Sequence, residues 1–192
     1  MIVLASKSAS RRAMLEAAGV AFRCLPAHVD ERRIEAGLEG ADPSTIAIAL
    51  AKAKCEAVGG EGNLVLGSDS LVIVDGERFD KPASRDDAVR HLRAFSGKVM
   101  ELHSAAALAR EGATIWSEAS VAHLHVRALS DDFIEHYLDA EWPEVAGCVG
   151  VFRIEAMGVQ LFNRIEGDHF TVLGMPLIRV LGALRDLGEL PA

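Results

Sequence analysis

The opening residues of this chain, up to Gly19, constrain its fold more than any other stretch. Residues 2–5 are Ile-Val-Leu-Ala, an apolar run typical of a buried strand, and residues 6–10 form a hydroxyl-rich turn. Residues 11–18 are good helix formers, and Gly19 follows them as a helix-ending residue. The sequence therefore predicts a strand, a turn and a helix in direct succession, which is typical of α/β folds.

The turn of this unit has the composition of a site for a polyanion. Its serine hydroxyls can donate hydrogen bonds, and the free N–H groups and positive dipole end of a helix attract phosphate. Full positive charge stands within or just after the turn, on Lys7, Arg11 and Arg12. Because the formal net charge of the chain is −8, an anion would have to bind at such a local cluster.

Composition favours a cytoplasmic protein with one domain over residues 1–192. Half of the residues are hydrophobic, which suits a sizeable α/β core. The acidic balance predicts no general attraction to nucleic acid or to anionic membranes. The three cysteines have no metal-binding spacing, which favours reduced thiols, and no apolar run approaches the roughly 20 residues of a membrane helix.

Turn and capping signals predict a mixed α/β chain with a long, twisted sheet. We expect helices at residues 43–58, 85–95, 131–138 and 177–187. We expect strands at residues 21–25, 64–66, 71–74, 149–152 and 159–164, and long strands between 98 and 128. Residues 27–42 are expected to be irregular, and residues 67–70 to form a loop between two strands.

Asp69 is the sharpest single candidate for chemistry. It is expected at the end of an apolar strand, between a glycine and serines, and strand ends of α/β sheets are where ligands usually bind. A carboxylate there can hold a metal ion or take a proton from water. The structural alternative, an Asx-turn that ends the strand, is equally consistent with the pattern.

Other charged residues have a structural and a functional interpretation. Lys81 precedes Pro82, so it is either a solvated loop lysine or a side chain aimed inward. Lys54 shares a helix face with Leu50, so it either covers apolar surface or reaches into a cleft. Glu31, beside Asp30 in a predicted loop, is either solvated or part of a cation site facing the phosphate turn.

A series of short motifs along the chain resembles the Maf family of nucleoside triphosphate pyrophosphatases. The opening Leu-Ala-Ser-x-Ser-Pro-Arg-Arg of the family is similar to residues 4–12, and its Val-Asp-Glu is similar to residues 29–31. Further motifs are matched in order by residues 50–55, 67–70, 80–82, 95–97 and 167–177. The resemblance spans nearly the whole chain.

The resemblance implies an elongated α/β fold with a central mixed sheet, flanking helices and a cleft between two lobes, as in inosine triphosphate pyrophosphatases. It implies hydrolysis of a nucleoside triphosphate to the monophosphate and pyrophosphate with a magnesium or manganese ion. Asp69 would be the catalytic base, and Glu31 and Asp69 would hold the metal. The residues implied for the phosphates are Ser8, Arg11, Lys54 and Lys81.

Base preference in the family is linked to three positions, which here are Ser10, Ser70 and Glu155. An ionised glutamate only accepts hydrogen bonds, so Glu155 should favour a base edge rich in donors, such as that of guanine. The family has glutamate there in its 7-methyl-GTP branch. Ser10 and Ser70 match neither that branch nor the dTTP/UTP branch.

The leading hypothesis is an enzyme that clears non-canonical or modified nucleotides, with a link to cell division arrest that the resemblance implies. The alternative is a nucleotide-responsive regulatory protein of cell division that binds without turnover. Such a binder would need the cations but not Asp69. A phosphomonoesterase, which would release orthophosphate, is a third hypothesis. The family would be consistent with a homodimer, for which the sequence shows no signature.

Overall fold

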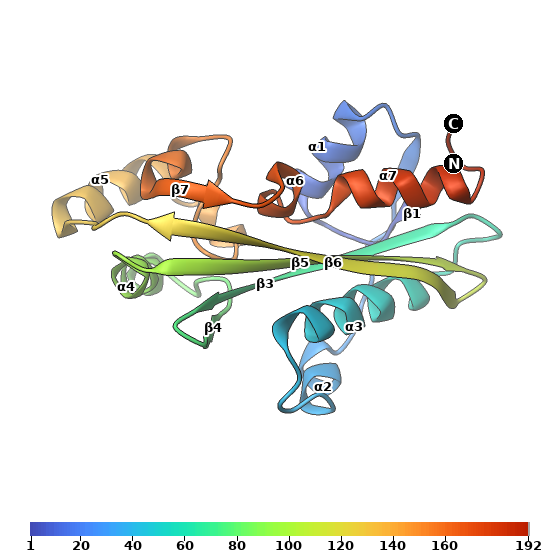
Figure 1. Ribbon diagram of the computed structural model, residues 1–192, viewed down its shortest axis with the longest axis horizontal. Helices are drawn as coiled ribbons and strands as arrows, with labels where there is room; N and C mark the ends of the chain where they lie inside the picture. Colours follow the sequence, from blue (N-terminus) through green and yellow to red (C-terminus); the bar gives the residue numbers. More distant parts are fainter. Residues whose placement is uncertain (192) are drawn as a thin grey trace. The chain divides into compact units, whose positions relative to one another are not determined.

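The computed structural model describes residues 1–191, whose strands form one mixed sheet. The strand order is β2-β1-β3-β5-β6-β7, and β4 pairs with β3. The first strands are parallel, β1 with β2 and with β3, whereas β4 on β3 and β7 on β6 are antiparallel. The predicted α/β class with a mixed sheet and flanking helices is thus confirmed (Figure 1).

The strands are β1 (Ile2–Leu4), β2 (Phe22–Cys24), β3 (Val65–Val74), β4 (Glu77–Phe79), β5 (Val99–Arg110), β6 (Ala113–Val126) and β7 (Phe162–Glu166). The α-helices are α1 (Ala9–Ala17), α2 (Glu31–Ala36), α3 (Pro43–Glu56), α4 (Arg85–Phe95), α5 (Asp131–Glu141), α6 (His169–Val172) and α7 (Leu177–Asp186). Short 3₁₀ helices are η1 (Glu144–Gly147) and η2 (Met157–Leu161).

The chain divides into two compact units. The first contains Met1–Ser70, His103–Val121 and the segment from Asp168 onward. The second contains Leu71–Leu102 and Ala122–Gly167. The long strands β3, β5 and β6 each contribute residues to both units.

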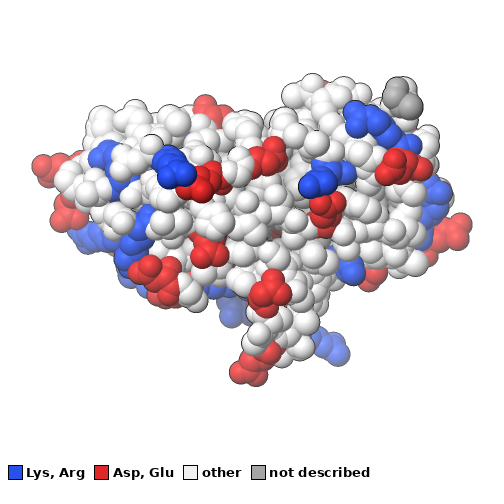
Figure 2. All heavy atoms as spheres, viewed as in Figure 1, with Lys and Arg blue, Asp and Glu red and all other residues white. Residues whose placement is uncertain are grey.

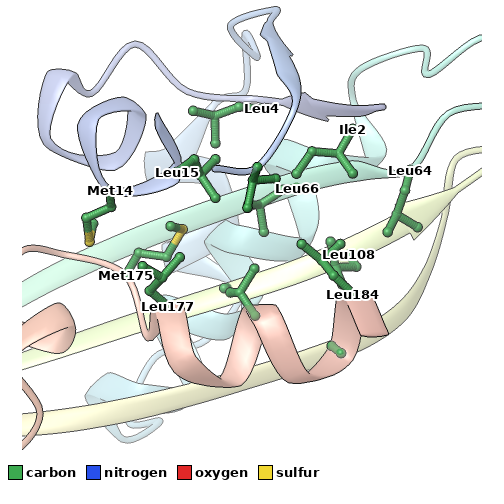
Figure 3. Packing of buried hydrophobic residues seen from close by; sticks show 14 residues of the cluster. Ile2, Leu4, Met14, Leu15, Leu64, Leu66, Leu108, Met175, Leu177 and Leu184 are labelled. Carbon is green, nitrogen blue, oxygen red and sulfur yellow. The ribbon is translucent and has the colours of Figure 1, made fainter. Parts of the chain in front are cut away.

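In the first unit, α1 and α7 cover one face of the sheet, and α3 lies on the other (Figure 1). The core under α1 and α7 collects apolar side chains from both helices and from β1, β3 and β5 (Figure 3). Leu15, Leu66 and Leu184 are completely buried there. Burying one such side chain contributes about 1.5–3 kcal/mol, so this layer fixes where the turn before α1 stands.

In the second unit, α4 and α5 pack on each other and are joined by ion pairs. Ser84 and Ser130 cap the two helices, each by accepting a backbone N–H bond, at the starts expected from the sequence. Arg85 on α4 contacts Glu135 at 2.7 Å and Asp139 at 2.6 Å on α5. These exposed pairs orient the helices more than they stabilise them.

Four sequence predictions of local structure are wrong in whole or in part. The strand expected at residues 159–164 begins only at Phe162, because Met157–Leu161 form η2. Residues 67–70 form no loop, because they continue β3 without interruption. The stretch 27–42 contains α2, which begins where Asp30 accepts a hydrogen bond from the N–H of Arg33. Residues 149–152 form no strand, because Gly150 and Val151 have φ angles of 81° and 56°.

The surface carries charges of both signs. On the face shown in Figure 2, acidic and basic side chains are interspersed. With the net charge of −8, any anion site must therefore rest on a local group of cations. Among residues 1–191, no helix has the length and apolar character needed to cross a bilayer.

Candidate active site

Lys54, Asp69 and Glu31 meet at one point in the first unit. The Lys54 ammonium donates a hydrogen bond to the Asp69 carboxylate and lies 2.8 Å from Glu31 Oε1. The Asp69 and Lys54 side chains are 10% and 14% exposed, whereas that of Glu31 is 46% exposed. One cation therefore holds two carboxylates, at a position that is open to solvent on the Glu31 side.

The local sequence explains how these side chains are brought together. Gly67 of β3 faces α3 so closely that a Cβ atom there would stand 2.1 Å from the Ala51 carbonyl oxygen. Side chains alternate along a strand, so Asp69 points to the same side as Gly67. Lys54 lies in the last turn of α3, one turn after Ala51, and thus reaches Asp69.

The context of Asp69 differs from both interpretations of the sequence. It lies inside β3, neither at a strand end nor in an Asx-turn, and it is buried. Its carboxylate is paired with a cation from a different element, as a buried charge requires. The interpretation of Lys54 as a lysine that merely covers apolar surface is wrong for the same reason.

Ser8 and Arg11 serve the local structure around the start of α1. Ser8 caps α1 by accepting a 3.3 Å bond from the Arg11 backbone N–H. The Arg11 guanidinium donates 3.0 Å bonds to the carbonyls of Gly174 and Ser68 and to the Ser70 hydroxyl. With a weaker contact to Ser6, these bonds use four of its five N–H groups.

The charge of Arg11 still acts on the carboxylate cluster. Burial lowers the pKa of Arg11 below its ordinary value, while the nearby charges of Asp69 and Glu31 raise it. An arginine remains protonated under these opposing influences. Arg11 therefore adds fixed positive potential beside the two carboxylates.

Ser10 and Ser70 both bind the turn that follows α6. The Ser10 hydroxyl donates to the Leu173 carbonyl at 2.9 Å, and the Ser70 hydroxyl donates to the Gly174 carbonyl at 2.9 Å. Gly174 has a φ angle of 101°, and a Cβ there would lie 3.3 Å from the Ser70 oxygen. Small side chains at both positions let this turn approach β3 closely.

Lys81 and Glu155 belong to the second unit. Both are exposed, Lys81 in the segment before Pro82 and Glu155 in a turn. Both act on the pKa of the Cys148 thiol. Burial is the main cause that raises this pKa, the charge of Glu155 raises it further, and the charge of Lys81 lowers it. The first unit thus contains Glu31, Lys54, Asp69 and Arg11, and the second contains Lys81 and Glu155.

The sequence analysis missed the polar layer that supports the site. Ser68 donates to the Gly174 carbonyl at 3.3 Å, and Ser104 donates to the Thr171 carbonyl at 2.9 Å. The spacing of Ser68 and Ser70 in a continuous strand was the available signal, since it places both on one face. A loop at residues 67–70, which the sequence predicts, does not indicate this shared face.

The donor set fits a divalent ion that is completed by a ligand. No group of three or more His, Cys, Asp or Glu side chains in the part of the chain that the structure describes is arranged to hold a metal. Glu31 and Asp69 do converge on one cation, and carboxylate oxygens are what magnesium and manganese prefer. Magnesium commonly takes only one or two carboxylates and fills its other positions with water and phosphates.

The fold and this cluster define an α/β protein with a partly buried carboxylate–lysine centre. A sequence profile of the Maf-like protein family matches residues 1–187. The chain belongs to this family.

Curated relatives match over nearly their full length. A 7-methyl-GTP pyrophosphatase of Rhizobium etli is 45% identical over 98% of this chain and 97% of that protein. Nucleoside triphosphate pyrophosphatase 1 of Jannaschia sp. is 44% identical over 97% and 96%. A solved structure of a HAM1 protein from Coxiella burnetii covers 65% of this chain and 72% of its own, at 17% identity and a TM-score of 0.41.

Proposed function

We propose that this protein hydrolyses a nucleoside triphosphate between its α- and β-phosphates, giving the monophosphate and pyrophosphate. The observation that carries the proposal is the meeting of Asp69, Lys54 and Glu31. Relatives that are 41–45% identical over nearly the whole chain are named as pyrophosphatases of nucleoside triphosphates or of 7-methyl-GTP. The chemistry of the cluster fits that reaction.

In this proposal, Asp69 orients a water molecule and accepts its proton as the water attacks phosphorus. Its pairing with Lys54 fixes the direction of the carboxylate oxygens. An ammonium group has three N–H donors, and two are directed at carboxylates. The third is left to hold a phosphate oxygen, whose negative charge grows in the transition state.

The remaining predicted residues have supporting roles in the proposal. Glu31 and Asp69 would hold a magnesium or manganese ion, which would neutralise charge on the triphosphate. Arg11 would contribute potential and a single donor, while Ser8 keeps the start of α1 in place. Lys81 would bind phosphate with its exposed ammonium group.

Base selection is assigned chiefly to Glu155. Glu155 is exposed and accepts hydrogen bonds only, so we propose that it binds the donor edge of a modified purine. Ser10 and Ser70 would act indirectly, through the Leu173–Gly174 turn that they bind. A preference for 7-methyl-GTP over UTP is the expected outcome.

The proposal extends to the setting of the protein. Cys24, Cys55 and Cys148 are free thiols, which supports a reducing, cytoplasmic location. Clearance of modified nucleotides, a link to cell division arrest and a homodimer follow only from the family resemblance. A regulatory binder without turnover has less support, because it would not require a buried carboxylate beside the cations.

The test is product analysis with a panel of triphosphates: ATP, GTP, CTP, UTP, dTTP and 7-methyl-GTP, each with magnesium and then with manganese. We expect monophosphate and pyrophosphate in equal amounts, with the highest kcat/KM for 7-methyl-GTP. Release of orthophosphate in place of pyrophosphate would favour the phosphomonoesterase. Nucleotide binding without any product would favour the regulatory binder.

A further inference from the structure

Glu141, the last residue of α5, is a buried carboxylate that binds both ends of one short segment. It is 5% exposed. Its Oε2 accepts a 2.9 Å bond from Arg153 Nε, and its Oε1 accepts a 3.2 Å bond from the Met157 backbone N–H. Glu155 stands midway between these two partners in the chain. Because a buried carboxylate needs its partners, the turn is held at both ends.

Other contacts restrict the same segment. A Cβ on Gly158 would stand 2.4 Å from the Arg153 carbonyl oxygen, so the chain closes tightly on itself after Glu155. Just before it, Val151 has a φ angle of 56°, a strained conformation that costs about 1–3 kcal/mol and persists only where surroundings impose it. The buried Tyr137 hydroxyl, which donates to the Val151 carbonyl at 2.9 Å, is one such restraint.

Glu155 itself is left available at the tip of this rigid turn. It is exposed, and its side chain has no hydrogen bond or ion pair with any residue from 1 to 191. Its charge is close to Arg153, whose pKa is raised chiefly by the hydrogen bond to Glu141 and further by nearby carboxylates including Glu155. A fixed backbone with a free carboxylate is the arrangement that a selective contact needs.

We propose that Glu141 is a positioning residue for substrate selection, which holds the Arg153–Met157 turn so that Glu155 meets the donor edge of the base. This inference rests on the proposed function, in which Glu155 selects a purine. Glu141 does not touch the nucleotide. It lowers the entropy that Glu155 would otherwise lose on binding. That benefit is greatest for a base edge with two neighbouring donors, such as N1–H and N2–H of guanine, and small for the mixed donor–acceptor edge of uracil.

The test compares kcat/KM for 7-methyl-GTP and for UTP in wild type, Glu141→Gln, Glu155→Ala and the double variant. Glutamine keeps an acceptor for Met157 but presents an amide in place of the charge that binds Arg153. The matched control is Glu135→Gln, which removes an exposed carboxylate on the same helix that also pairs with an arginine. Thermal unfolding of each variant confirms that the folded protein is being compared.

We expect Glu141→Gln to lower the ratio of kcat/KM for 7-methyl-GTP to kcat/KM for UTP about tenfold or more, while kcat/KM for UTP itself changes little. In the Glu155→Ala background the same substitution should leave the ratio unchanged, and Glu135→Gln should match wild type. An unchanged ratio in Glu141→Gln, an equal fall in both backgrounds, or a wild-type ratio near one would each overturn the proposal.

Failure of the proposed function is recognised separately. If wild type releases no pyrophosphate from any triphosphate, the ratio of the two dissociation constants is measured by calorimetry in the same variants. A rise in the dissociation constant for 7-methyl-GTP relative to that for UTP, confined to Glu141→Gln with Glu155 intact, would support the positioning role without turnover. An unchanged binding ratio, or no binding of either nucleotide, would overturn it.

Discussion

One ammonium group organises the candidate site at the scale of single residues. Lys54 contacts both Glu31 and Asp69, so two carboxylates that would repel each other stand together. Asp69 is the more buried of the two and Glu31 the more exposed. This difference supports the proposal that Asp69 transfers the proton and that Glu31, which is open to solvent, contributes more to metal binding.

Glu31→Gln tests the metal assignment. It keeps the shape of the side chain and an acceptor for Lys54, but it weakens the attraction for a divalent ion. The magnesium concentration for half-maximal pyrophosphate release should rise about tenfold or more, while maximal activity at saturating metal is largely recovered. Titration of activity with magnesium measures this.

Glu39→Gln is the control, because Glu39 is an exposed carboxylate just after α2. It should leave the magnesium titration unchanged. Equal magnesium requirements in Glu31→Gln and wild type would remove Glu31 from the metal site.

The identities of these residues could be predicted from the sequence, whereas their contacts could not. The family resemblance pointed to Glu31, Lys54 and Asp69, and the structure brings them together. The spacing of these residues along the sequence does not predict that Lys54 binds both carboxylates, since that depends on how α2, α3 and β3 pack. Nor did the sequence show that most donors of Arg11 are used by the protein itself.

At the scale of elements, the uninterrupted β3 strand separates two kinds of polar contact. Asp69 points to α3 and Lys54, while Ser68 and Ser70 point to the turn at Gly174. A loop at residues 67–70 could not impose this alternation. The close approach of α3 at Gly67 is what brings Lys54 within reach of Asp69.

Gly67→Ala tests that approach. The added Cβ would stand 2.1 Å from the Ala51 carbonyl oxygen and 2.7 Å from the Cys55 nitrogen, both backbone atoms that cannot turn aside. We expect a loss of about 1–3 kcal/mol or more in the free energy of unfolding, measured in urea. Activity of the folded fraction should also fall, since Lys54 moves with α3.

Gly59→Ala provides the comparison, because nothing lies within 4 Å of a Cβ at that position. Its stability should stay within about 0.5 kcal/mol of wild type. Similar unfolding curves for Gly67→Ala and Gly59→Ala would contradict the packing of α3 on β3.

Capping residues made most helices predictable. Asp42, Ser84 and Ser130 each accept a backbone N–H bond at a predicted helix start, whereas Ser8 caps α1, which begins two residues before its expected start. Asp30 caps α2 in the same way, but the polar composition of residues 27–42 led to its interpretation as irregular. The prediction of a strand at residues 149–152 is wrong, because the sequence of an apolar, β-branched run does not indicate that Val151 adopts a positive φ.

At the scale of the whole molecule, a buried histidine links stability to pH. His91 on α4 packs against the rings of Phe79 and Phe95. Burial lowers the pKa of His91 below its ordinary 6.5, and Arg90 adds to this while Asp87 opposes it. The unfolded chain therefore binds a proton at a higher pH than the folded chain does.

The free energy of unfolding should thus fall as the pH decreases below 6.5, because protons then favour the unfolded state. In His91→Leu this fall should be smaller, whatever the absolute stability of the variant. His123→Gln, which changes an exposed histidine, should keep the wild-type slope. Urea unfolding between pH 7.5 and about 5.5 measures the slope, and an unchanged slope in His91→Leu would contradict the role of burial.

The most direct test of the central claim, that Asp69 serves catalysis in a triphosphate pyrophosphatase, is to measure pyrophosphate release and nucleotide binding in Asp69→Asn. Asp75→Asn is measured beside it, since Asp75 is exposed, directly follows β3 and pairs with Lys98. We predict that Asp69→Asn binds nucleotide about as well as wild type but loses roughly 10²–10⁴ in kcat, whereas Asp75→Asn keeps its activity. Wild-type turnover by Asp69→Asn would contradict the account.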